Sequence, residues 1–285
     1  MSRNVLSASS LILNLPKDEL QSDHHPHAPA ASVGAVMETI MPDLKKTAIV
    51  TGASRGIGAA VAERLGRDGF AVVINYADKP EAAKKLSDKI EAAGGRSLIA
   101  RADVTDSAAM EAMFEQATSA FGGVDVLVNN AGIMKLSSIA ETDDATFDEQ
   151  MAVNLKGVFN GLRLAARRLR DGGRIVSFSS SVVGLYQPTY GVYAAAKAAI
   201  EAMTHVLSKE LGKRGITVNA IAPGPIETQL FMKGKEKAEI DKVVGLTPLG
   251  RLGQPEDIAR AISFLVGPDG AWINGQILRA NGGII

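Results

Sequence analysis

The stretch 46-KTAIVTGASRGIGAAVAERLGR-67 decides the fold, because a short apolar run passes through a glycine-rich turn into an amphipathic segment. The run 46-KTAIV-50 has the length and composition of a buried strand, and 59-AAVAERLGR-67 has helical spacing. A strand, a tight turn and a helix in this order form the first half of a βαβ unit.

The same alternation of short apolar runs and longer amphipathic stretches continues from residue 43 to the end of the sequence. We expect further strands at 70–75, 97–100, 124–129, 174–179, 216–221 and 275–279, and helices at 59–67, 81–93, 107–121, 143–169, 193–211 and 255–266. Glycines 94, 122, 172 and 212 stand where helices are expected to stop. The pattern predicts one doubly wound, Rossmann-type α/β domain, with a seven-stranded parallel sheet and helices on both faces.

Composition excludes several classes of protein. The 285 residues carry 31 Lys and Arg against 31 Asp and Glu, which gives no basic surface for nucleic acid or an anionic membrane. There is no cysteine, so disulfides, thiolate metal sites and cysteine nucleophiles are absent. No apolar run approaches the ~18 residues of a membrane-spanning helix. We expect a soluble cytoplasmic protein without a metal.

Residues 1–42 differ from the rest and are expected to form a disordered extension, with 22-SDHHPHAPAAS-32 showing no lasting period. His24, His25 and His27 lack the carboxylate or thiolate framework of a metal site, so a solvated tail is the better interpretation. The apolar piece 11–15 is too short for a secretory signal. Met37 and Met41 offer an alternative start of translation.

The turn 51-TGASRGIG-58 places glycines at the first βα crossover, where helix-start amides are exposed. Amide N–H groups and the helix dipole stabilise a pyrophosphate, and glycine lets it approach the backbone. A tight turn without a ligand is the alternative that this motif alone leaves open.

Cofactor choice is expected at the end of the second strand, where an acidic residue would accept hydrogen bonds from the ribose of NAD. Asn75 stands there, followed by Tyr76, and neither repels a 2′-phosphate. Arg55 offers a guanidinium to that phosphate, which favours NADP, although Asp78 argues for NAD and Arg55 could be a solvated loop charge.

The strongest chemical signal is Tyr193 followed four residues later by Lys197, because such side chains share one face of a helix. An adjacent ammonium favours the phenolate and brings tyrosine toward useful acid/base strength. Ser180 lies thirteen residues before Tyr193, just past a predicted strand, and Ser181 is the alternative. Adjacent strand residues point to opposite faces, so one of the two faces the tyrosine, and the spacing of Ser180 to Tyr193 resembles that of a known family, which favours Ser180.

These motifs together resemble the classical branch of the short-chain dehydrogenase/reductase family, over residues 43–285. The turn has the spacing G-x-x-x-G-x-G, and the resemblance implies that Gly52, Gly56 and Gly58 form it. Its further implied cofactor contacts are Ser54, Arg55, Ile57, Asn75, Tyr76, Asp103, Val104, Asn130, Ala131, Gly132, Tyr193, Lys197, Pro223, Gly224, Ile226 and Thr228. Taken alone, Asp103 could equally be a helix cap.

The resemblance also implies a mechanism. Tyr193 would protonate the substrate oxygen, Ser180 would hydrogen-bond it, and Lys197 would lower the tyrosine pKa and hold the ribose. Asn154 matches a fourth catalytic position that would anchor a water in the proton relay; without the resemblance, it could face solvent or mark a helix irregularity.

The segment from about 225 to 253 is expected to form a mobile lid over the substrate, although an ordinary packed helix would look the same. Loop residues expected to select the substrate are Met134, Leu185, Tyr186, Gln187 and Tyr190. The resemblance implies a homotetramer that pairs through helices 143–170 and 193–211.

The function implied is an NADP-dependent carbonyl reductase or alcohol dehydrogenase, similar to 3-oxoacyl-carrier-protein reductases and sugar dehydrogenases, with NAD as the second choice of cofactor. A catalytically silent nucleotide-binding sensor or scaffold is the alternative, and an epimerase or dehydratase sharing the Tyr-x-x-x-Lys pair is a third.

Overall fold

The computed structural model describes residues 45–285, so the predictions for residues 1–42, including the histidines and the alternative start, lie outside the described residues. Seven strands form one parallel sheet in the order β3-β2-β1-β4-β5-β6-β7, which confirms the predicted doubly wound fold. The strands are β1 (Thr47–Val50), β2 (Ala71–Tyr76), β3 (Arg96–Arg101), β4 (Val124–Asn129), β5 (Leu169–Phe178), β6 (Thr217–Pro223) and β7 (Ile277–Ala280).

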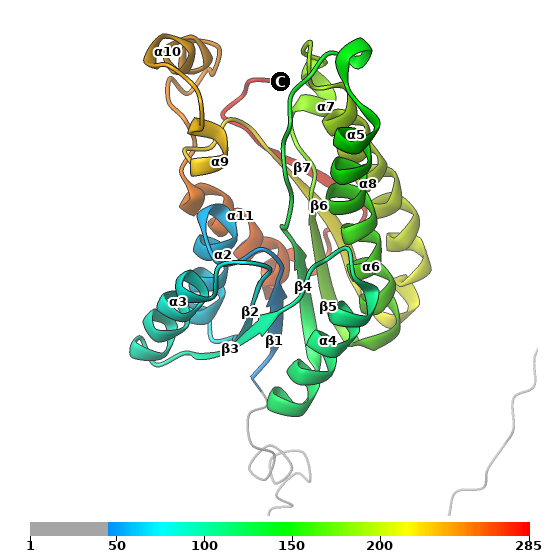
Figure 1. Cartoon of the computed structure of the whole chain (residues 1–285). Coiled ribbons are helices and arrows are strands. Elements are labelled where there is room, and N and C mark those ends of the chain that lie inside the picture. Colours follow the sequence, from blue (N-terminus) through cyan, green and yellow to red (C-terminus); the bar gives the residue numbers. More distant parts are fainter. Residues whose placement is uncertain (1–44) are drawn as a thin grey trace, which may run out of the picture. The chain divides into compact units, whose positions relative to one another are not determined.

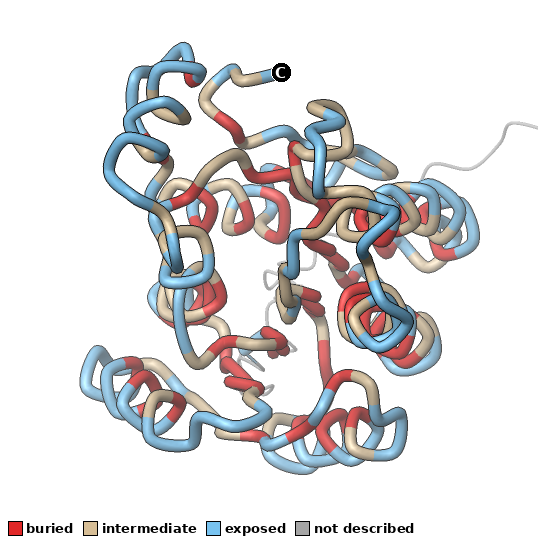
Figure 2. The backbone as a smooth tube through the Cα atoms, turned by 45° about the horizontal axis from the view of Figure 1, so that its top comes forward, coloured by how far each residue is buried: buried red, intermediate tan, exposed pale blue. Residues whose placement is uncertain are grey.

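Helices cover both faces of this sheet (Figure 1). One layer holds α2 (Gly56–Arg67), α3 (Pro80–Ala92) and α11 (Pro255–Val266), and the other holds α4 (Ser107–Phe121), α6 (Gly157–Arg168) and α8 (Gly191–Glu210). Side chains alternate between the layers, since Ala48 and Val50 pack with the first core and Ile49 with the second. Figure 2 shows the result, with buried residues in the strands and on the inner sides of the helices.

The predicted helix 143–169 is interrupted. It consists of α5 (Asp144–Met151), a π-helical turn η2 (Ala152–Lys156) and α6, after which β5 begins at Leu169 rather than at 174. The extra residue of a π-helical turn changes which side chains face inward, and here it accompanies the burial of Asn154. Gly122 ends α4 with a φ of 80°, as predicted, whereas Gly172 bends β5 instead of ending a helix.

All seven strands run in the same direction, so the loops after their carboxyl ends gather at one edge of the sheet. The strand order reverses between β1 and β4, and ligands of open α/β sheets bind in the crevice at such a switch point. Within residues 45–285, no helix is both long and apolar enough to cross a membrane.

The predicted lid contains two helices, α9 (Gln229–Met232) and α10 (Lys237–Gly245), and we call residues 228–252 the α9–α10 segment. Its two ends are pinned together beside the sheet. Ile226 and Gly253 form an isolated parallel bridge, the Glu227 N–H donates to the Gly253 carbonyl at 2.8 Å, and the Gln254 side chain donates to Glu227 at 2.8 Å. The segment therefore extends from a hydrogen-bonded base, residues 226–227 and 253–254, which we call its root.

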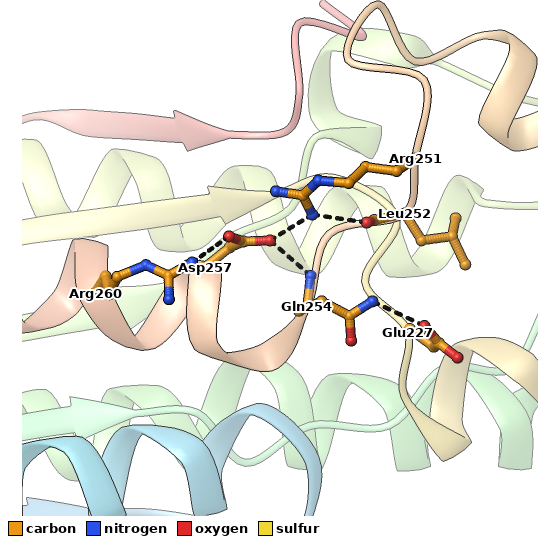
Figure 3. Close-up of polar contacts among 6 residues, drawn as sticks. All are labelled: Glu227, Arg251, Leu252, Gln254, Asp257 and Arg260. Atoms are coloured by element: carbon orange, nitrogen blue, oxygen red, sulfur yellow. Dashed lines mark hydrogen bonds and ion pairs between the residues drawn. The ribbon is translucent and has the colours of Figure 1, made fainter.

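The carboxylate of Asp257 ties this root to the start of α11 (Figure 3). It accepts hydrogen bonds from the backbone N–H of Gln254 at 2.8 Å, from Arg251 at 2.7 Å and from Arg260 at 2.5 Å. The Arg251 hydrogen bond, followed by that of the Gln254 N–H, lowers the pKa of Asp257 to about 2.

Replacing Asp257 by Asn should destabilise the fold in a pH-dependent way. The folded-state pKa lies below the ordinary 3.8, so the charge contributes stability above about pH 4 and loses it as pH falls toward 2. We expect the variant to be about 1 kcal/mol less stable at pH 7, after allowing for solvent screening, and the difference to be about halved at pH 3. Urea unfolding of both proteins at pH 7 and at pH 3 measures this difference in the free energy of unfolding. The same difference at the two pH values would contradict the prediction.

Candidate active site

The glycine turn lies against the loop that follows β4. Gly52 and Gly56 have φ values of 61° and 57°, which disfavour residues with a side chain. A Cβ on Gly52 would come within 2.9 Å of the Ala131 Cα, and one on Gly58 within 2.5 Å of the Asn130 side chain. Close packing of the two loops therefore requires glycine at 52 and 58, and the positive φ favours it at 56.

Hydrogen bonds fix the same contact. The Asn130 side chain donates to the carbonyl oxygens of Thr51 at 2.9 Å and Gly52 at 3.1 Å. In return, the Thr51 hydroxyl accepts from the N–H groups of Asn130 and Ala131, at 3.0 and 3.1 Å. These hydrogen bonds thus hold the loops after β1 and β4 together at the carboxyl edge of the sheet.

The first turn of α2 has the features of an anion site. Its N-cap, Arg55, makes no side-chain cap, and no acidic residue stands in the first turn. The first amides of a helix have no intrahelical acceptor, so they suit the pyrophosphate of a dinucleotide. The exposed Arg55 adds a cation beside them. This turn therefore fits the predicted cofactor.

The side chain of Asn75 is hydrogen-bonded within the protein. Asn75 is 1% exposed, its side-chain oxygen accepts from the Gly52 N–H at 3.1 Å, and its amide nitrogen donates to the carbonyls of Ala100 and Ala102. Because both ends of the amide are paired with backbone, Asn75 joins β2, β3 and the glycine turn.

The predicted adenine contacts lie after β3. Asp103 is exposed and accepts from the backbone and hydroxyl of Thr105, both at 2.8 Å. It is not a helix cap, because Asp106 caps α4. Val104 is 7% exposed and lies against Gly157, where an added Cβ would come within 2.6 Å of it.

Tyr193 and Lys197 lie one turn apart near the start of α8, as their spacing requires. The Lys197 side chain is 3% exposed, and its Nζ donates to the Phe178 carbonyl at 2.8 Å. The same Nζ lies 5.5 Å from the centre of the Tyr193 ring. The end of β5 and the start of α8 therefore converge on one point.

The three consecutive serines have three different partners. The Ser181 hydroxyl is buried and donates to the Ala222 carbonyl at 3.2 Å, while that of Ser179 is buried and bound to Glu201 at 2.6 Å. Ser180 is the serine whose hydroxyl acts on the Tyr193 phenol, because it is the one that lowers the pKa of that group. Because adjacent side chains along the chain alternate in direction, Ser180 lies beside the phenol while its two neighbours are bound within the protein.

The electrostatics of the pair differ from expectation. Burial raises the pKa of Tyr193 to about 12, with the Ser180 hydrogen bond acting in the opposite direction. Burial also lowers the pKa of Lys197 to about 8. The expected lowering of the tyrosine pKa by Lys197 is not present in this arrangement, because desolvation dominates and the ammonium points at the Phe178 carbonyl.

Asn154 lies in the π-helical turn and is fully buried. Its side-chain oxygen accepts from the Ile133 N–H and its nitrogen donates to the Ile133 carbonyl, both at 2.9 Å. Its oxygen also lies 3.0 Å from where a Cβ of Gly132 would be. The amide is thus used to hold the loop after β4 against the helix.

These residues surround a cleft at the carboxyl edge of the sheet. Predicted residues that line it are Ile57, Asn130, Gly132, Met134, Ser180, Leu185, Gln187, Tyr190, Tyr193, Lys197, Pro223, Gly224, Ile226 and Thr228. Predicted residues outside the lining are Gly52, Ser54, Arg55, Gly56, Gly58, Asn75, Tyr76, Asp103, Val104, Ala131, Asn154 and Tyr186. Among residues 45–285, no cluster of three or more His, Cys, Asp or Glu side chains is placed to hold a metal ion.

Glu201 and Ser179 are site residues that the sequence analysis missed. Ser179 lies between Phe178 and Ser180 at the end of β5, and the Phe178 carbonyl accepts the hydrogen bond from Lys197. The Ser179 hydroxyl is hydrogen-bonded to Glu201, which stands one turn after Lys197 on α8. This contact joins the end of β5 to α8. The signal was available, since Glu201 shares the face of Lys197 at i, i+4, but the partner of Glu201 depends on tertiary packing.

Comparison with known proteins gives consistent matches. The family model described as enoyl-(acyl carrier protein) reductase matches residues 52–285. An Arabidopsis thaliana protein named NADPH-dependent aldehyde reductase-like protein, chloroplastic, is 40% identical over 88% of this chain and 98% of its own length. A Picea abies short-chain type dehydrogenase/reductase is 41% identical over 84% of this chain and 92% of its own.

A solved structure of similar fold is that of a short chain dehydrogenase from Burkholderia cenocepacia in complex with NADP. It is 38% identical, has a TM-score of 0.80, and the match covers 85% of this chain and 99% of that one.

Replacing Glu201 by Ala should lower the free energy of unfolding by about 1.5 kcal/mol, because the buried Ser179 hydroxyl loses its best partner. Glu201→Gln keeps an oxygen acceptor and should lose less than half of that. Urea unfolding measures both, with Glu210→Ala as a control on an exposed glutamate of the same helix. Equal losses for Ala and Gln would show that the Ser179 hydrogen bond is not the source.

Proposed function

The chain belongs to the short-chain dehydrogenase/reductase family, and on that premise we propose that it is an NADP-dependent oxidoreductase acting on a carbonyl compound or secondary alcohol. The observation that carries the proposal is the convergence of Ser180, Tyr193 and Lys197 in one cleft beside the glycine turn. A protein that only binds a nucleotide does not require such a proton-transferring set.

The proposed cofactor site follows from the chain's own groups. The uncapped amides at the start of α2 would hold the pyrophosphate, and Arg55 would meet the 2′-phosphate of NADP. At the end of β2 stands the neutral Asn75, whose side chain is hydrogen-bonded to the backbone, so it does not oppose that phosphate; Asp78, two residues beyond β2, is the acidic residue that would favour NAD. The name of the Arabidopsis relative and the NADP in the Burkholderia structure support this choice, with NAD as the alternative.

Bound NADPH would supply the hydride to the substrate carbon. With a pKa of about 12, the Tyr193 phenol is protonated at neutral pH, and it would give its proton to the more basic alkoxide that forms on the substrate. Ser180 would donate a hydrogen bond to the same oxygen as negative charge develops there. In the oxidising direction the same proton returns to Tyr193.

Lys197 and Asn154 would support this transfer. Lys197 has a pKa of about 8, so below that pH its ammonium lies beside the phenol and the predicted ribose position. The side-chain amide of Asn154 binds both backbone polar groups of Ile133, and the main chain of the π-helical turn would hold a water of the proton relay.

We retain the homotetramer and the cytoplasmic location as proposals. Exposed apolar side chains on the predicted pairing helices support assembly: Phe147 is 46%, Phe159 45% and Val206 57% exposed. The relative from Arabidopsis is named as chloroplastic, so its compartment lends no support to a cytoplasmic location.

Tyr193→Phe should reduce turnover by about a thousandfold, because it removes the proton donor and leaves the ring. NADPH binding should stay within about twofold of the unaltered protein. Absorbance of NADPH with a panel of aldehydes and ketones measures turnover, and cofactor fluorescence measures binding. Undiminished turnover in the variant would refute the assignment.

Arg55→Ala should raise the KM for NADPH by about ten- to a hundredfold and leave that for NADH nearly unchanged, because only NADPH offers the guanidinium a 2′-phosphate. Arg67→Ala is a matched control, since Arg67 stands on α2 at its opposite end. An equal effect on both cofactors would show that Arg55 contacts a group common to them.

A further inference from the structure

The half of the cleft beyond the catalytic residues is built almost wholly of apolar side chains. On one side Leu230 and Phe231 of α9, Val243 of α10 and Leu246 line it, and on the other side stands Leu185 of α7 (Val182–Leu185). Ile284, near the end of the chain, lines it between them, and Figure 1 shows the C-terminus between α7 and the α9–α10 segment.

Two of these apolar side chains are about half exposed in the protein itself. Leu230 is 51% and Leu246 54% exposed, although both line the cleft. An exposed apolar surface at the rim of a cleft is stabilised when an apolar ligand covers it.

Charge is nearly absent from this lining. Of the side chains of residues 45–285 that line the cleft, Lys197 is the single charged one, and its ammonium is bound to the Phe178 carbonyl. The lysines of the α9–α10 segment are not in the lining, and Lys235 donates to the Phe231 carbonyl at 2.7 Å. A carboxylate or phosphate on the substrate would therefore lose water without gaining a cation.

Few polar groups remain for a hydroxylated substrate. The Ser179 and Ser181 hydroxyls and the Asn130 amide are bound within the protein, and the Thr228 hydroxyl accepts from the Phe231 N–H. Gln187 and Tyr190 are the polar side chains left at the substrate end. Such a lining offers too few hydrogen-bond partners for the many hydroxyl groups of a sugar.

We propose that the substrate is an uncharged carbonyl compound, or the matching alcohol, that carries a bulky apolar group such as an aromatic ring system, and that Leu246 is one of the residues that select it. This inference rests on the proposed function for the position of the reacting carbon. It narrows the substrate class at that site by excluding anionic substrates and sugars.

The test compares two ligands with the same ketone and ring system, 2-acetonaphthone and 6-acetyl-2-naphthoate. Dihydroxyacetone is the third ligand and represents a small, hydroxylated carbonyl compound. Binding is measured by titration calorimetry on the full-length Tyr193→Phe protein, with and without NADPH, so that turnover does not interfere. We expect the neutral ketone to bind at least about tenfold more tightly than its carboxylate. Equal binding, or tighter binding of the carboxylate or of dihydroxyacetone, would overturn the inference.

A matched pair of second substitutions, each made in the Tyr193→Phe protein, locates the apolar contact. Leu246→Ser should weaken binding of 2-acetonaphthone by about fivefold, because a half-exposed leucine loses its contact with the ring. Leu249→Ser is the control, since Leu249 is 69% exposed, is three residues away and does not line this cleft. Equal effects of the two would overturn the assignment of Leu246.

Failure of the proposed function would appear in the NADPH binding and turnover of the unaltered protein, not in the comparison of neutral and charged ligands. In that case the unaltered protein would not bind NADPH or would not oxidise it with any carbonyl compound. The contrast between the neutral and charged ligands would still decide what the cleft accepts, because it is a binding measurement.

Discussion

The contact between the glycine turn and the loop after β4 is the constraint on which the rest of the site depends. The Asn130 amide holds the carbonyls of Thr51 and Gly52, and the Thr51 hydroxyl holds two N–H groups in return. Only glycine at 52 and 58 leaves room for this approach. The start of α2 is thereby aimed into the crevice where the strand order reverses.

Buried amides repeat this role around the sheet edge. Asn75 joins β2 and β3 to the glycine turn, Asn154 fixes the loop at Ile133, and Asn129 donates to Ser177 on β5. A buried amide must have its polar groups paired, so each one specifies the position of two neighbouring segments. The cleft is formed by loops that this network holds in place.

The pKa values of Tyr193 and Lys197, the proposed acid/base pair, depend on burial. Removing Tyr193 and Lys197 from water moves their pKa values in opposite directions, toward about 12 and about 8. Both shifts favour the uncharged forms. The pKa values of both groups are therefore set by the residues that bury them, and binding of the charged cofactor would change them further.

The sequence by itself determined the seven strands of one doubly wound parallel sheet and the placement of Tyr193 and Lys197 one helical turn apart, because periodicity and spacing are local properties of the chain. The tertiary structure decided what depends on partners distant in sequence. It turned Asn75 inward to the backbone and broke the helix 143–169 at Asn154, and it paired Ser179 with Glu201. It also gathered Leu185, Leu246 and Ile284 around one apolar cleft. Spacing along the chain cannot encode these contacts, because hydrogen-bond partners and cavity walls are set by how distant segments pack.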